Sequence, residues 1–137
     1  ISKSLKNKVS EENLNDKVFF LGKINPETLH KLTPLADLGL SLEEDLGLNY
    51  RFALPNKIFD YIQGEVPILV SNLPEMSKVI SAYKVGEIVK NRTPEKLAKQ
   101  IKEVLEKEYT KELKLAKTVL IWEQQEEKLI AIFNNLK

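Results

Sequence analysis

Residues 67–71 read Pro-Ile-Leu-Val-Ser, a short apolar run that contains the β-branched residues Ile68 and Val70 and no charge. A continuous apolar run of this length is typical of a strand covered on both faces, as the strands of parallel sheets are. Helical patterns flank it over 55–63 and Pro74–Tyr83, and each opens with proline, which is favoured in a first helical turn. The stretch therefore predicts a buried parallel strand between two helices.

Further apolar runs are expected to be strands of the same sheet: 17–22 (KVFFLG), 36–41 (ADLGLS) and 86–90 (GEIVK). A helical pattern over Pro26–Leu32 separates the first two of them. Strands that alternate with helices over short connections are typical of α/β domains. The sequence therefore predicts a Rossmann-like parallel sheet with flanking helices, in which 67–71 lies between the second and the last of these runs.

Beyond the last predicted strand the pattern is helical. The pair Thr93-Pro94 is a cap followed by a proline and starts one helix, and a second helical stretch covers 111–136. We therefore divide a single domain into an α/β region over 1–92 and a helical C-terminal tail over 93–137.

Composition excludes several functional classes. The 137 residues carry 21 Lys and Arg against 20 Asp and Glu, a net charge of +1 that argues against a nucleic-acid partner. The absence of cysteine excludes thiolate chemistry and fits a reducing cytosol, and the single histidine, His30, excludes multi-histidine metal sites. We expect His30 to be a packing or surface residue. With no membrane span or signal peptide visible, we expect a cytoplasmic protein, either free or peripheral at the inner membrane face.

A long connection over 42–54 leads from the second strand to the helix 55–63, and loops of this length at a strand's carboxyl end are usually functional or disordered. If Pro55 is the first helical residue, Leu54 before it has no oxygen to cap the helix, and the amides of the first turn lack intrahelical partners. These amides and the Lys57 ammonium together favour a phosphate. The alternative is that water satisfies the amides and that Lys57 is a surface lysine.

Asp60 lies three residues after Lys57, close to the same helical face. A carboxylate beside a bound phosphate can accept hydrogen bonds from both hydroxyls of a ribose. The alternative is an ordinary surface pair of lysine and aspartate.

Several segments carry a family resemblance in order along the chain: 18–22 (VFFLG), 36–40 (ADLGL), 54–61 (LPNKIFDY), 66–71 (VPILVS) and the pair Trp122-Glu123. Together they resemble the C-terminal domain of GT-B glycosyltransferases of group 1, also called family four. We expect Trp122 to lie in the core or to anchor the last helix against another domain.

In that family this domain holds the donor, so the resemblance implies an enzyme that transfers a sugar from a nucleotide diphosphate sugar, without a further cofactor. It implies that the diphosphate lies at the helix start, against Pro55, Asn56 and Lys57, and that Asp60 holds the ribose. Ser71 ends a predicted strand at the edge where α/β sheets bind ligands, so we expect it either to contact the donor or a phosphate or to cap the next helix. Lys23 follows the first predicted strand at the same edge, and we expect it either to lie beside the base or to be solvated.

The long loop departs from the family pattern, in which an acid lies near the donor sugar. The family spacing, counted back from Asp60, places this acid at Phe52. Counted from Pro55 instead, it places the acid at Tyr50, and neither residue is acidic. Relatives with an LPNK helix often have asparagine in this loop, so Asn49 is a candidate contact for sugar hydroxyls. The acidic residues 43–45 could supply a carboxylate, or they are solvated loop charge.

The family's sheet has six parallel strands, and this chain supplies the last four. Because it also begins at Ile1 rather than Met, we expect a piece of a longer enzyme that lacks its N-terminal acceptor domain and binds rather than turns over. The run 17–22 would then need a new neighbour, in a second chain (a dimer or swapped assembly) or by closure onto 36–41.

The resemblance implies a role in cell-surface polysaccharide synthesis. The alternative is a non-catalytic α/β signalling or protein-interaction module. A phosphorylated signalling module of this kind would need an aspartate at the end of a strand, and none of the predicted strands ends in one.

Overall fold

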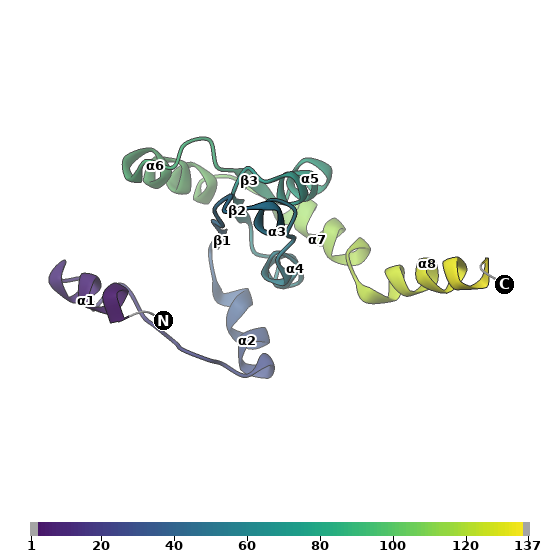
Figure 1. Cartoon of the computed structure of the whole chain (residues 1–137), viewed down its shortest axis with the longest axis horizontal. Coiled ribbons are helices and arrows are strands. Elements are labelled where there is room, and N and C mark those ends of the chain that lie inside the picture. Colours follow the sequence, from purple (N-terminus) through teal and green to yellow (C-terminus); the bar gives the residue numbers. More distant parts are fainter. Residues whose placement is uncertain (1–2, 136–137) are drawn as a thin grey trace.

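The computed structural model of the chain describes residues 3–135 and centres on a three-stranded parallel sheet of order β1-β2-β3 (Figure 1). Its strands are β1 Gly39–Ser41, β2 Ile68–Val70 and β3 Gly86–Ile88. In the central strand, Leu69 pairs with Leu40 on one side and with Glu87 on the other. The parallel order predicted for the last three apolar runs is confirmed, with each strand shorter than the run that contains it.

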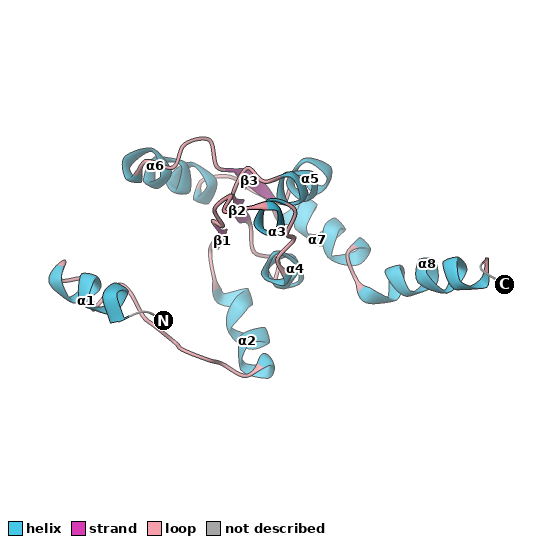
Figure 2. Ribbon diagram, viewed as in Figure 1, coloured by secondary structure: helices cyan, strands magenta, loops and turns pink. Residues whose placement is uncertain are grey.

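Helices make up most of the remaining chain, as Figure 2 shows. They are α1 Lys3–Glu11, α2 Pro26–Leu32, the 3₁₀ turn η1 Thr33–Leu35, α3 Leu48–Arg51, α4 Asn56–Gln63, α5 Pro74–Tyr83, α6 Pro94–Leu105, α7 Thr110–Val119 and α8 Trp122–Asn134. In Figure 1, α4, α5 and α7 gather close to the sheet, whereas α1 and α8 extend away from it. The bounds predicted for α2 and α5 are confirmed.

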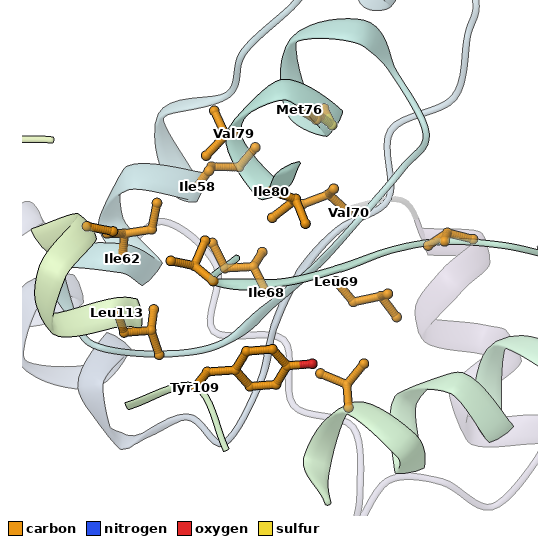
Figure 3. Packing of buried hydrophobic residues seen from close by; sticks show 14 of the residues in the cluster. Ile58, Ile62, Ile68, Leu69, Val70, Met76, Val79, Ile80, Tyr109 and Leu113 are labelled. Carbon is orange, nitrogen blue, oxygen red and sulfur yellow. The ribbon is translucent and has the colours of Figure 1, made fainter. Parts of the chain in front are cut away.

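The hydrophobic core lies around β2, whose three residues are all fully buried, as a central strand covered on both faces requires. In Figure 3, Ile58 of α4 and Ile80 of α5 lie on the same side of this strand as Val70, and Leu69 lies on the other side. Burying one aliphatic side chain of this size contributes about 1.5–3 kcal/mol. The core therefore fixes α4 and α5 against the sheet.

A side chain of α6 takes the place of a neighbouring strand beside β3. Gln100 is buried; its Oε1 accepts a hydrogen bond from the Lys90 N–H at 3.0 Å, and its Nε2 donates to the Ile88 carbonyl at 2.8 Å. The side-chain amide thus satisfies backbone groups that a free sheet edge would leave unpaired.

The tail is divided into two helices, where the sequence predicted one continuous stretch. The break falls at Leu120 and Ile121, and Gln63 at the end of α4 accounts for it. Its Nε2 donates to the carbonyls of Lys117 in α7 and of Leu120 just beyond it, both at 3.2 Å, so that these carbonyls bond to a side chain instead of to a further helical turn. Leu136 and the side chain of Trp122 lie outside the described part of the chain.

The prediction of a strand over 17–22 is wrong. These residues form an irregular connection between α1 and α2 in which Phe19 is 71% and Leu21 67% exposed. An extended run becomes a strand only beside another strand, and the helical residues of α2 and η1 separate this run from β1 (Figure 1). Closure onto 36–41 is therefore not observed, and the outer edge of β1 has no partner strand within residues 3–135.

Candidate functional site

The carboxyl ends of the three strands border a cavity of about 770 Å³. Its walls come from the connections that follow the strands, over 43–45, 71–73 and 89–93. Parallel α/β sheets bind their ligands at this edge, where successive connections converge. The cavity is therefore the candidate site.

Arg92 links these connections to one another. Its Nη1 donates to Ser71 Oγ at 2.9 Å and to the Glu43 carbonyl at 3.4 Å, and its Nη2 donates to the Leu42 carbonyl at 2.8 Å. The sequence reasoning missed Arg92, although its position shortly after the run 86–90 placed it at the same edge of the sheet. The guanidinium thus joins the connection after β3 to the connections after β1 and β2.

Ser71 is buried at the centre of this network, and its hydroxyl donates to the Glu43 carbonyl at 2.6 Å. Its N–H donates to the Ser41 carbonyl at 2.8 Å. The alternative that Ser71 caps the next helix is not observed, because the N-cap of α5 is Leu73, without a side-chain cap. Ser71 instead joins the ends of β1 and β2.

Glu43 and Lys57 form an ion pair at the rim of the cavity. Lys57 Nζ lies 2.6 Å from Glu43 Oε1, and Ser41 Oγ donates to Glu43 Oε2 at 2.7 Å. Partial burial raises the pKa of Glu43, but the hydrogen bonds from Lys57 and Ser41 outweigh it and hold the pKa below its ordinary value. Glu43 is thus a carboxylate at neutral pH.

The start of α4 lies beside this ion pair. Pro55 is the N-cap, with φ −65° and ψ 137°, so the helix begins one residue later than predicted. The absence of a side-chain cap is as predicted. Within residues 3–135, the amides of Asn56 and Lys57 have no hydrogen-bond acceptor. These amides are available to an anion, whereas the Lys57 side chain, which is 43% exposed, is already paired with Glu43.

Of the predicted site residues only Ser71 lines this cavity. Pro55, Asn56 and Lys57 do not, and the start of α4 meets the cavity through the Lys57–Glu43 ion pair. Asp60, half-buried, lines a separate cavity of about 200 Å³ together with residues of α2 such as Leu29 and His30. The reason is that Asp60 lies on the side of α4 that faces α2 and η1. His30 is exposed, in agreement with the expectation of a surface or packing residue.

Asn49 and Lys23 are both exposed. Asn49 lies in α3, a short helix within the long connection, which the Arg51–Asp45 ion pair holds at 2.6 Å. Lys23 precedes α2, and its predicted place at the carboxyl end of a strand is wrong because 17–22 is not a strand.

A model of the family described as group 1 glycosyl transferases matches residues 2–120. The chain belongs to the group 1 glycosyltransferase family. The match includes the sheet, the candidate cavity and the whole of α4 and α7. It confirms the resemblance inferred from the sequence, and sugar transfer is the general activity that it assigns to this glycosyltransferase domain.

Comparisons of this group 1 glycosyltransferase domain with curated proteins and with solved structures returned no match. The described residues contain no group of three or more His, Cys, Asp or Glu side chains that could hold a metal ion. None of the helices between residues 3 and 135 is both long and apolar enough to cross a bilayer.

Proposed function

We propose that this chain is the donor-binding part of a glycosyltransferase that transfers a sugar from a nucleotide diphosphate sugar to an acceptor. The observation that carries the proposal is the family match over the residues that build the cavity and the start of α4. The free amides of Asn56 and Lys57, next to the Lys57 ammonium, support a phosphate contact there.

The remaining predicted contacts complete this proposal. Asp60, on the same helix, is proposed to accept hydrogen bonds from the ribose, and Ser71 and Asn49 to contact phosphate and sugar. The proposal also includes a role in cell-surface polysaccharide synthesis and an acceptor domain outside this chain, without which the chain binds a donor but does not turn it over.

The test is a calorimetric titration of the chain with nucleoside diphosphates and with the corresponding nucleosides. Lys57→Ala is expected to weaken diphosphate binding about ten- to hundredfold, and to weaken nucleoside binding less, because a charge-assisted phosphate contact is lost. Unchanged diphosphate binding in Lys57→Ala would contradict the phosphate contact. Absence of saturable binding by the parent chain would favour the non-catalytic α/β module instead.

Asp60→Ala separates the ribose contact from the phosphate contact. Since the ribose is common to nucleosides and nucleoside diphosphates, this variant is expected to weaken the binding of both by a similar factor, about ten- to hundredfold. The same titrations measure it. A variant that binds both ligands as the parent does would remove Asp60 from the donor site.

A further inference from the structure

The lysine at the start of α4 is not a free cation. Its Nζ lies 2.6 Å from Glu43 Oε1, so a carboxylate charge lies directly beside the ammonium. The pair has no net charge, and a ligand that approaches Lys57 also approaches Glu43. Lys57 is therefore not an isolated positive charge. The attraction of a phosphate to its ammonium is offset by repulsion from the Glu43 carboxylate.

Glu43 is held in place from several directions. Its carboxylate accepts from Ser41 Oγ at 2.7 Å, and its carbonyl accepts from Ser71 Oγ at 2.6 Å and from Arg92 Nη1 at 3.4 Å. Its side chain is 23% exposed. Because backbone and side chain are both bonded to the ends of the strands, the carboxylate is a fixed negative charge rather than a mobile surface group.

The substrate and the product of the proposed reaction differ in charge at the phosphates. In a nucleotide diphosphate sugar each phosphate is esterified on both sides, so the diphosphate carries two negative charges. After transfer, the terminal phosphate of the nucleoside diphosphate is a monoester with a second pKa near ~6, and it gains most of a further charge at neutral pH. A fixed carboxylate distinguishes these two ligands by repulsion alone.

We propose that Glu43 is a specificity-determining residue of the donor site, which disfavours the nucleoside diphosphate product relative to the nucleotide sugar. This inference rests on the proposed function. Repulsion of one additional charge at a partly exposed site is moderate and is screened by salt, so the expected effect is about three- to tenfold in relative affinity. Weaker retention of the product frees the site for the next donor.

The test compares matched pairs of ligands: UDP with UDP-glucose, GDP with GDP-mannose, and ADP with ADP-glucose. For the pair that the parent chain binds, dissociation constants are measured by calorimetry at low salt. Glu43→Gln is expected to tighten nucleoside diphosphate binding about three- to tenfold and to change nucleotide-sugar binding less. Glu43→Ala removes the charge without placing an amide in the network. It is expected to show the same change in the ratio of the two dissociation constants, nucleoside diphosphate to nucleotide sugar.

The matched control is Glu65→Gln, which removes a carboxylate from another lysine pair, 2.9 Å from Lys117 Nζ and beyond the C-terminal end of α4. It is expected to leave the ratio unchanged. The inference is overturned if the ratio of the two dissociation constants is unchanged in both Glu43 variants, or if both ligands bind more tightly by the same factor. Either result leaves the proposed donor site intact. Absence of binding by the parent chain to every pair overturns the proposed function, and the inference with it.

Discussion

The Glu43 carboxylate lies between Lys57 and Ser41, and these contacts give it a pH signature. Its pKa is lower in the folded chain than in the unfolded chain, so the unfolded state binds its proton at the higher pH. The stabilising contribution of Glu43 is therefore present above the ordinary carboxyl pKa and is lost as pH falls through the lowered value.

Glu43→Gln is accordingly expected to lower the free energy of unfolding at pH 7, by less than about 1 kcal/mol because the pair is partly exposed. The difference from the parent is expected to shrink as the pH falls below the ordinary carboxyl range toward 3, since protonation then removes the charge from the parent too. Thermal unfolding followed by circular dichroism across this range measures it. Glu44→Gln, whose carboxylate reaches Arg92 only at 4.0 Å, is the control; a difference for Glu43→Gln that does not vary with pH would contradict the assignment.

Residue identity alone made part of the site predictable. The uncapped start of α4 and its lysine were visible in the sequence because a cap is a property of adjacent residues. The sequence did not reveal that Lys57 pairs with Glu43 or that Arg92 links the connections. Both contacts depend on where the connections after three different strands meet. The separation of Asp60 from the cavity depends in the same way on distant residues, since Asp60 borders a second cavity that residues of α2 and η1 line.

Among the elements, β3 depends on a side chain of α6 for its backbone hydrogen bonds. Gln100→Leu removes the partners of the Lys90 N–H and the Ile88 carbonyl, and leaving such groups unpaired costs about 1–3 kcal/mol each where they are buried. We expect Gln100→Leu to lower the midpoint of urea unfolding clearly. Lys99→Leu changes the exposed neighbour on the same helix and is expected to cost only about 0.5 kcal/mol. Equal midpoints for the two variants would contradict this account of the sheet edge.

Elements whose signals are local were predictable, and those that depend on distant partners were not. A proline in the first turn marks the starts of α2 and α6 within the helices' own sequence; Asn25 caps α2 with its side chain, whereas Thr93 before α6 makes no side-chain cap. The break between α7 and α8 depends instead on Gln63, far away in the chain. The run 17–22 has the composition of a strand, but composition does not provide the neighbouring strand that it needs.

At the scale of the whole molecule, the outer edge of β1 is the open side of the sheet within residues 3–135. Leu40 of this strand is 38% exposed, and exposed apolar residues of 17–22, such as Phe19 at 71%, lie elsewhere on the surface. Open sheet edges and exposed apolar side chains favour pairing with another chain. We predict that a second chain pairs with this region.

We therefore expect the chain to associate as its concentration rises, and Leu40→Lys to weaken that association because charge on an edge strand opposes pairing. Sedimentation velocity over a range of concentrations measures both. Lys3→Leu, which changes an exposed residue of α1, is the comparison for a general effect of surface charge. A parent chain that sediments as a monomer at every concentration would contradict the prediction.

Helix α4 carries Lys57, the partner of Glu43, in its first turn and ends with Gln63, whose side chain donates to the carbonyls of Lys117 and Leu120 at the end of α7. A helix of this length spans about 12 Å and bends little. Its two ends therefore move as one body, and α8 starts immediately beyond the residues that Gln63 holds. A displacement of the carbonyls that Gln63 holds at the end of α7 is therefore passed along α4 to Lys57 and its ion pair with Glu43.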